Sequence, residues 1–338
     1  AICEDLAAHG VAAPLWWSLV DGTVPVPAGA RPVVVGSPQW VEALCTSRVI
    51  VTNDHLPSWF SKREGQHLLQ TWHGTPIKKL LHDAPKAVTL RYRRLMDRQV
   101  PQWDLLLAQS PQAGRRLQQA LGYRGPVRVG EYPRNVRLLG GAEVRRRVRH
   151  ELGIAAGQPV ILYAPTWRES LRPSTGAAGC ATVHGPGPVG ELDGPRLAEL
   201  LDAVVLMRTH HMNRARPGPG LVDVSRYPNI EELMMAADVL VSDYSSIFLD
   251  FALTGKPAVV YVPDLEHYRD VERGLYGDWP RRSGLPVALD HDELTFHLNR
   301  ILGDFDVQAA RREVLEVDPA PVLENLAWIR GWITRFLR

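Results

Sequence analysis

The sequence predicts an α/β fold of two Rossmann-type domains that face each other across a cleft. Short apolar runs alternate with helical segments along the whole chain, which is typical of βαβ units and a mostly parallel sheet. The chain has 338 residues, which suits two domains of ordinary size. Hydrophobic residues make up 45% and charged residues 22% of the chain, so we expect buried cores rather than disorder.

The first domain is expected to span residues 1–139. It opens abruptly with a helix at Ala1–His9, which suggests that an upstream segment has been lost or trimmed. Two further helices are expected at Gln39–Thr46 and Pro111–Leu121. The expected strands are Leu15–Val20, Pro32–Gly36, Arg48–Thr52, Leu68–Trp72, Leu105–Gln109 and Val127–Gly130.

The second domain is expected at residues 140–320, followed by a C-terminal helix within 321–338. The charged stretch Gly140–Leu152 should contain the hinge and the first helix of this domain. The Gly/Pro-rich stretch Arg168–Leu192 is expected to be an insertion, a mobile lid being the alternative. The expected strands are Val160–Pro165, Val204–Thr209, Leu221–Val224, Val239–Ser242 and Ala258–Val262, and the expected helices are Gly194–Asp202, Ile230–Ala237, Ser246–Thr254 and Pro321–Leu337.

Charge and cysteine content exclude several classes of protein. The formal net charge is only +2, which argues against a nucleic-acid binder with a basic stripe. Three widely spaced cysteines form neither a disulfide framework nor a metal site, so a reducing compartment is expected. No signal peptide is visible, and no apolar run reaches the roughly 18 residues that span a bilayer.

A histidine follows one predicted strand of the first domain. The segment Gln70–Lys79 reads as a strand, a turn and a helix, with Pro76 at the first helical position and Thr75 as a cap. His73 would then lie at the carboxyl end of the strand, where α/β active sites gather. Histidine titrates near neutrality and can deprotonate an attacking hydroxyl. The alternative is a histidine packed in a turn.

Hydroxyl groups follow a strand of the second domain in the segment Ser242–Ser246. The start of the next helix would bring free backbone N–H groups beside Ser245 and Ser246, an arrangement that binds anions such as a diphosphate. Ordinary helix capping by either serine is the alternative. A carboxylate repels phosphate, so we expect Asp243 to orient a hydroxyl or to fix the turn.

Two other strands of the second domain also end in polar residues. Arg208 and His210 lie at the end of one strand, and Arg168 follows the other. Guanidinium groups and histidines bind phosphate oxygens well, so these residues are candidate phosphate ligands. An exposed strand end is the alternative. Trp167, just before Arg168, could line a pocket, but a tryptophan buried in the core is the favoured interpretation.

Several well-known signatures are missing from the sequence. It has no G-x-G-x-x-G fingerprint and no Walker loop. It also lacks the G-x-S-x-G elbow of α/β-hydrolases and the H-E-x-x-H motif of zincins. These gaps argue against NAD chemistry, P-loop phosphoryl transfer, hydrolase chemistry and zincin chemistry.

The motifs resemble those of the CDP-glycerol glycerophosphotransferase family, the teichoic acid primases and polymerases. They come in family order and span most of the chain, and together they are highly specific. The resembling segments are Lys62–Lys79, Pro133–Asn135, Ala164–Arg168, Arg208–His210, Ala237–Asp250, Lys256–Pro257 and Arg273–Tyr276.

The resemblance implies a GT-B-like fold with the cytidine diphosphate donor mainly on the second domain. It maps the proposed catalytic base onto His73 and a donor-phosphate ligand or acid onto His210. The other motif positions are expected to bind substrate, and they are Thr75, Lys78, Arg168, Arg208, Ser242, Asp243, Ser245, Ser246, Asp250 and Arg273. No metal and no cofactor is expected.

Four positions depart from the family pattern. His211 stands where a proline is usual, Leu81 where a glycine is expected, and Val136 where an aspartate often occurs. The segment Gly277–Pro280 also differs. These departures bear on the identity of the substrate rather than on the reaction type.

We therefore expect a transferase that moves a polyol phosphate, foremost glycerol phosphate, from a CDP-linked donor to an acceptor hydroxyl. CMP would be released in the synthesis of a teichoic-acid-like or capsular wall polymer. The expected partners are the CDP-polyol donor and a lipid-linked polyol-phosphate acceptor at the cytoplasmic face of the membrane. Arg91–Arg94 is a candidate contact with anionic lipid, a solvated helix face being the alternative.

Two other functions stay open on the sequence. The first is a nucleotide-sugar glycosyltransferase of the same GT-B architecture, which would attack an anomeric carbon and release UDP or GDP. The second is a non-catalytic module that binds anionic polymers through a degenerate site. His73, Ser245 and Ser246 are intact, which argues against degeneracy.

Overall fold

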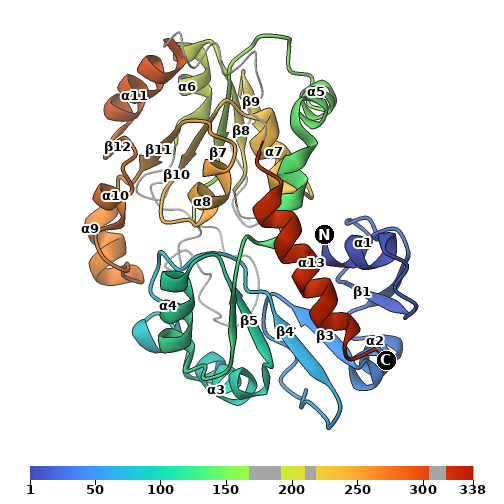
Figure 1. Cartoon of the computed structure of the whole chain (residues 1–338). Coiled ribbons are helices and arrows are strands. Elements are labelled where there is room, and N and C mark those ends of the chain that lie inside the picture. Colours follow the sequence, from blue (N-terminus) through green and yellow to red (C-terminus); the bar gives the residue numbers. More distant parts are fainter. Residues whose placement is uncertain (167–191, 210–217, 304–316, 338) are drawn as a thin grey trace, which may run out of the picture. The chain divides into compact units, whose positions relative to one another are not determined.

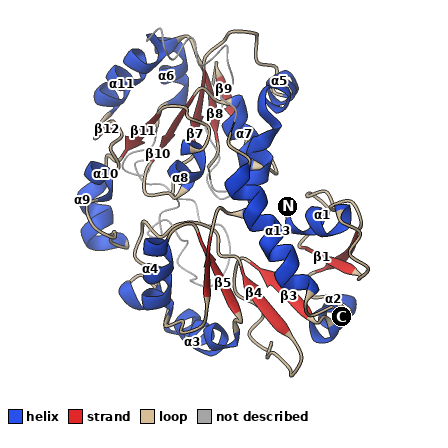
Figure 2. Cartoon of the chain, viewed as in Figure 1, coloured by secondary structure: helices blue, strands red, loops and turns tan. Residues whose placement is uncertain are grey.

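The computed structural model describes residues 1–166, 192–209, 218–303 and 317–337. The chain divides into two compact units. The first comprises Ala1–Pro76, Leu80–Leu139 and Asp318–Arg338, and the second comprises Ile77–Lys79 and Gly140–Val317. Parallel strands and surrounding helices make up each unit (Figure 2), as in a Rossmann-type domain.

The main sheet of the first unit has strand order β3-β4-β5-β6, and β1 pairs separately with β2. All of these pairs are parallel. The elements are α1 (Ile2–Ala8), β1 (Leu15–Leu19), β2 (Ala30–Val34), α2 (Pro38–Thr46), β3 (Val49–Thr52), β4 (His67–Gln70), η1 (Leu81–Asp83), α3 (Leu90–Gln99), η2 (Val100–Gln102), β5 (Leu105–Ala108), α4 (Pro111–Leu121), β6 (Val127–Val129), η3 (Pro133–Gly140) and α13 (Ala320–Thr334).

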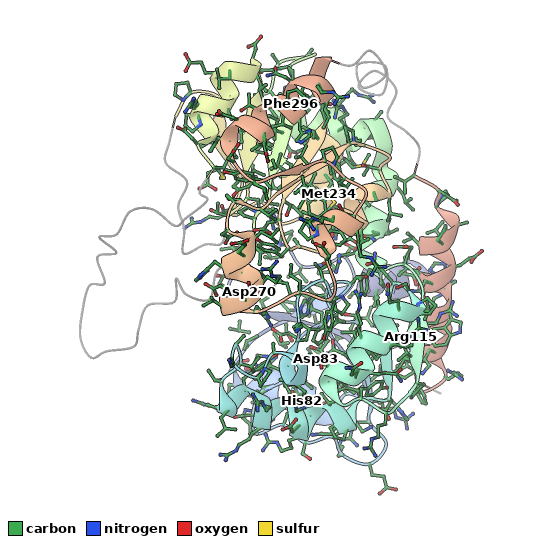
Figure 3. All side chains as sticks on the ribbon, turned by 90° about the vertical axis from the view of Figure 1, so that its left-hand side faces the viewer. His82, Asp83, Arg115, Met234, Asp270 and Phe296 are labelled. Carbon is green, nitrogen blue, oxygen red and sulfur yellow. The ribbon has the colours of Figure 1, made fainter. Side chains whose placement is uncertain are left out.

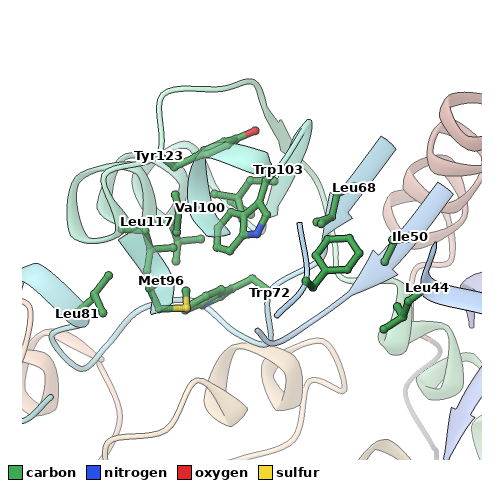
Figure 4. Packing of buried hydrophobic residues seen from close by; sticks show 14 of the residues in the cluster. Leu44, Ile50, Leu68, Trp72, Leu81, Met96, Val100, Trp103, Leu117 and Tyr123 are labelled. Atoms are coloured by element: carbon green, nitrogen blue, oxygen red, sulfur yellow. The ribbon is translucent and has the colours of Figure 1, made fainter. Parts of the chain in front are cut away.

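Both faces of this four-stranded sheet are buried. Side chains alternate along each strand, so Leu68 and Leu106 join a core with residues of α2, α3 and α4 (Figure 4). Leu69 and Leu107 point the other way and pack with α1 and α13. The C-terminal helix, which the sequence set apart, is therefore part of the first unit's core.

The six-stranded parallel sheet of the second unit has strand order β12-β11-β10-β7-β8-β9. The chain builds outward from β7 through β8 and β9, then returns to the other side of β7 and builds outward from β10. The elements are α5 (Gly141–Glu151), β7 (Val160–Tyr163), α6 (Gly194–Leu201), β8 (Val204–Met207), β9 (Leu221–Asp223), α7 (Ile230–Ala236), β10 (Val239–Ser242), α8 (Ile247–Ala252), β11 (Ala258–Tyr261), α9 (Leu265–His267), η5 (Tyr268–Glu272), α10 (Trp279–Arg282), β12 (Val287–Ala288) and α11 (His291–Gly303).

Helices cover both faces of this sheet as well (Figure 1). On one face Ile161 and Val241 pack with apolar residues of α6 and α11, such as Leu298. Phe296 of α11 lies at the surface instead (Figure 3). On the other face α7 contacts β7, and α8 contacts β10. The central strands are buried along their whole length, which explains why they read as continuous apolar runs.

The expected α/β architecture of two Rossmann-type units is confirmed, and each predicted strand recurs within two residues of its predicted ends. The sequence reasoning gave no bounds for α3, α9, α10, α11 and β12. In α3 only Met96 and Gln99 are buried, so the helix carries almost no apolar periodicity. The expected insertion at Arg168–Leu192 lies outside the described residues, apart from Leu192.

Candidate functional site

His73 lies beyond β4, at the carboxyl end of the first unit's sheet. Its side chain is exposed, and its Nδ1 is 2.9 Å from the backbone oxygen of Asn53, which follows β3. A carbonyl oxygen only accepts hydrogen bonds, so Nδ1 carries the hydrogen and the lone pair of the neutral ring lies on Nε2. This geometry presents a histidine that can take up a proton at Nε2.

The turn that carries His73 has an unusual backbone conformation at Trp72. Its φ of +55° is in the left-handed region, which bulky residues rarely adopt. The indole is buried with Met96 and Trp103 (Figure 4), and the imidazole of His73 stacks on it with centroids 4.5 Å apart. Strained backbone persists only where the surroundings hold it, and such sites are often functional.

The helix predicted to begin at Pro76 is wrong. Residues Ile77–Lys79 are extended and run antiparallel to residues 274–276, with an isolated bridge between Lys78 and Leu275 and backbone hydrogen bonds on either side of it. Proline at a first helical position is only a local preference, and pairing with a distant segment overrides it here.

This pairing joins two family motifs within the second unit. Arg273 donates from Nε to the backbone oxygen of Lys79 at 3.0 Å. Gly274 has a φ of +81°, and a Cβ at this position would lie 3.1 Å from Cδ of Lys79, so a side chain is disfavoured there. Lys78 and Arg273, both predicted to bind substrate, are half-buried on this paired segment.

Thr75 caps no helix in the described chain, and its hydroxyl serves another purpose. It donates to Oε1 of Gln109 at 2.8 Å. Gln109 in turn donates to Oε2 of Glu131 at 3.2 Å, and Asn135 donates to the same oxygen at 3.3 Å. The His73 motif is thereby tied, within the first unit, to the Pro133–Asn135 motif.

In the second unit, the segments that follow β7 and β10 meet where the strand order reverses. Ser242 donates from Oγ to the backbone oxygen of Ala164 at 2.5 Å. The buried carboxylate of Asp243 accepts from the backbone N–H of Thr166 at 2.8 Å and of Tyr244 at 2.6 Å. Such a reversal is the place where open α/β sheets bind ligands. Ser242 and Asp243 hold its two strand ends together.

Ser245 and Ser246 come next and are half-buried at the start of α8. Ser245 accepts through Oγ from the N–H of Ile247 at 3.3 Å. Ser246 immediately precedes the helix, but among the described residues its side chain caps no N–H of α8. Asp250, within α8, is buried. The hydroxyl groups thus lie between a strand and the helix that follows it, as the sequence indicated, and the strand order places them at its point of reversal.

The strand β8 lies next to β7, and Arg208 is the first residue after β8. The guanidinium donates to the backbone oxygens of Val224 at 3.2 Å and Tyr227 at 2.6 Å. Burial lowers the pKa of this guanidinium, and nearby Glu231 opposes the shift. Arg208 therefore supports the chain that follows β9. The other two predicted phosphate ligands, Arg168 and His210, lie outside the described residues.

The sequence reasoning missed two residues that contact these sites. Gln70 is fully buried at the end of β4, and it contacts the backbone of Trp72 in the His73 turn and of Asp54 in the loop after β3. Its signal was a polar residue that ends a run of buried leucines. Trp279 donates from Nε1 to the backbone oxygen of Asp243 at 3.2 Å, from a segment that departs from the family pattern. Across the described ranges, no group of three His, Cys, Asp or Glu is placed to hold a metal ion.

Comparison with known proteins matches most of the chain to one family. The sequence model of CDP-Glycerol:Poly(glycerophosphate) glycerophosphotransferases matches residues 1–317. The chain is 31% identical over 261 residues to a teichoic acid poly(glycerol phosphate) polymerase of Bacillus spizizenii, covering 74% of this chain and 65% of the relative. It is 32% identical over 269 residues to the Bacillus subtilis polymerase of the same name, covering 75% of this chain and 35% of the relative. This chain thus spans less than two thirds of either relative.

Solved structures of the wall teichoic acid polymerase TagF have the same fold. One of them is 25% identical, with a TM-score of 0.78, and the match covers 99% of this chain and 85% of that one. A variant of the same polymerase superposes with a TM-score of 0.80 at 24% identity. The fold is therefore GT-B-like, as the resemblance implied. The chain belongs to the CDP-glycerol:poly(glycerophosphate) glycerophosphotransferase family.

Proposed function

We propose that the protein transfers a polyol phosphate, most simply glycerol phosphate, from a CDP-linked donor to an acceptor hydroxyl during synthesis of a teichoic-acid-like wall polymer. The observation that carries this proposal is the geometry of His73, whose Nδ1 contacts the backbone oxygen of Asn53 at a strand end. Family membership supports the same reaction.

In this reaction His73 acts as the general base. Its Nε2 takes the proton of the acceptor hydroxyl as the oxygen attacks the polyol-bearing phosphorus of the donor. A new oxygen–phosphorus bond forms, the bond to the CMP oxygen breaks, and CMP leaves with the negative charge. Positioning and electrostatic stabilisation account for most of the barrier reduction in phosphoryl transfer.

The donor diphosphate is proposed to bind the second unit at the reversal between β7 and β10. Ser245 and Ser246 would donate hydroxyl hydrogen bonds to its oxygens, while Ser242 and Asp243 keep the two strand ends in register. The donor site would be completed by further motif residues, which are Arg208, Asp250, Lys78 and Arg273. The roles of Arg168 and His210 as phosphate ligands rest on the family motifs.

The acceptor is proposed to be lipid-linked and displayed at the inner face of the cell membrane. Among the described residues, no helix has the length and apolar composition that crossing a bilayer requires.

Support for a peripheral contact comes from α3, where Leu90, Arg91, Arg94 and Arg98 are all exposed. Each basic residue near an anionic surface contributes about 1 kcal/mol to binding. Replacing Arg91 and Arg94 by glutamate should abolish sedimentation with anionic vesicles if this helix makes the contact.

Labelling the phosphorus next to the polyol in CDP-glycerol tests the reaction directly. With a lipid-linked glycerol-phosphate acceptor, the label should enter the polymer while unlabelled CMP is released. Label that stays in a released nucleoside diphosphate would mean glycosyl-type transfer and would overturn the proposal. The His73→Ala variant serves as the control, because it should leave the label in the donor.

A further inference from the structure

We infer that Gln70 is a positioning residue that fixes the tautomer and orientation of His73. The inference rests on the proposed function, in which Nε2 of His73 is the base. Gln70 ends β4, and its side chain has no solvent exposure. A buried amide needs partners at both of its polar atoms, and the two partners found here lie on the two segments that set the geometry of His73.

The oxygen of the Gln70 side chain supports the turn that carries His73. Oε1 accepts from the backbone N–H of Trp72 at 2.9 Å. Trp72 is the residue with a φ of +55°, so this hydrogen bond stabilises a conformation that its side chain disfavours. Holding Trp72 in place also holds the indole on which the His73 ring stacks.

The nitrogen of the same side chain supports the loop that faces His73. Nε2 of Gln70 donates to the backbone oxygen of Asp54 at 3.2 Å. That oxygen also accepts from Oγ1 of Thr52 at 2.9 Å, so the loop is held from two sides. The residue between Thr52 and Asp54 is Asn53, whose own oxygen receives Nδ1 of His73 at 2.9 Å.

One amide therefore connects both parts of the histidine's environment. If the turn or the loop shifted, Nδ1 of His73 would lose the backbone oxygen of Asn53 as its acceptor. The hydrogen of the neutral ring would then no longer be held on Nδ1 by that contact. A ring with its hydrogen on Nε2 cannot accept the proton of an acceptor hydroxyl at that atom. The expected defect is thus in proton transfer rather than in donor binding.

The test replaces Gln70 by methionine, which keeps the length of the side chain but removes both hydrogen bonds. Gln66 provides a matched control at the other end of β4. It is also a buried glutamine, and it donates to the backbone oxygens of Leu44 and Ser47. Both variants lose hydrogen bonds of a buried glutamine, one just before β4 and one at its end, and only Gln70→Met disturbs the surroundings of His73.

Nitrogen-15 NMR of histidine-labelled protein reports the tautomer, with the His73 signal assigned by its loss in His73→Ala. The native protein and Gln66→Met should show the hydrogen on Nδ1, whereas Gln70→Met should show a mixture of tautomers. In Gln70→Met, kcat should fall by about 10–100-fold while KM for the CDP-polyol changes by less than about 2-fold. A Gln70→Met variant with an unchanged tautomer, or with the same kcat as Gln66→Met, would overturn the inference. Normal turnover by His73→Ala would instead overturn the proposed function, so the two failures are distinguishable.

Discussion

Replacing Lys256 by methionine should change how the stability of the protein depends on pH. Lys256 precedes β11, and its Nζ donates to the backbone oxygens of Met234, Met235 and Ala237 at 2.8–3.0 Å, around the C-terminal end of α7. Arg145 donates to the backbone oxygen of Ala237 at the same helix end, and it donates to the carboxylate of Asp238 at 2.5 Å. These groups surround the ammonium, although the residue as a whole is only half-buried.

The size of the effect follows from the pKa of the lysine. Burial lowers the pKa of Lys256 from 10.5 to about 7, and Arg145 acts in the same direction while Asp238 opposes it. The unfolded chain, with the ordinary value of 10.5, binds more protons than the folded chain between these two pKa values. Stability must therefore rise with pH in this window, at a slope that approaches about 1.4 kcal/mol per pH unit.

The measurement compares the native protein with Lys256→Met by urea unfolding at several pH values. The free energy of unfolding of the native protein, relative to the variant, should rise by up to about 2 kcal/mol from about pH 7 to about pH 9. From about pH 5 to about pH 7 it should change by less than about 0.5 kcal/mol. Lys86→Met, at an exposed lysine, is the control for general effects of pH. A constant difference between the native protein and Lys256→Met would show that the carbonyls of α7 keep the lysine charged, and the reasoning would fail.

Three further variants separate residues that act in the reaction from residues that support the fold. His73→Ala should lower turnover by about 10²–10⁴-fold and leave calorimetric donor binding unchanged, and a near-normal rate would remove the histidine from the mechanism. Replacing Ser245 and Ser246 by alanine should weaken the binding of CDP-glycerol more than the binding of CMP, because CMP lacks the second phosphate. Each hydrogen bond to a charged group contributes about 1.5–3 kcal/mol. Equal losses for both ligands would make the serines structural. Asp243→Ala removes the acceptor of the buried N–H of Tyr244 and of the half-buried N–H of Thr166. It should cost about 2–5 kcal/mol of stability, so an unchanged Tm would contradict the assigned contacts.

The strands and most long helices could be predicted because burial leaves a periodic pattern along the chain. Val160–Tyr163 and Val239–Ser242 are fully buried, and runs of this kind read as strands without any knowledge of their neighbours. The helix at Pro76 failed for the opposite reason. Its local preference was correct, but the pairing that overrode it comes from a segment about two hundred residues further along the chain.

Side-chain contacts with distant backbone were the other part that the sequence could not predict. The amide of Gln70 reaches the oxygen of Asp54, and Arg145 reaches the carbonyls at the end of α7. Neither contact leaves a repeat or a spacing, because the acceptor is a backbone oxygen that every residue has. The sequence identified the motif residues as a group. It could not show which of them bind the surrounding backbone, because that requires the three-dimensional structure.

That division changes how loss of activity should be interpreted in this family. Asp238 and Lys256 belong to the shared motifs, yet their polar atoms are bound to the framework of α7, β7 and the helix α5. Ser242 and Asp243 likewise bind the backbone that follows β7. Substituting any of these residues would disturb contacts that hold the second unit together, so turnover would fall whether or not the residue touches substrate. A change in kcat therefore assigns a catalytic role only when the free energy of unfolding of the same variant is unchanged, and His73, whose exposed ring lies outside the buried core, is the position where that condition is most easily met.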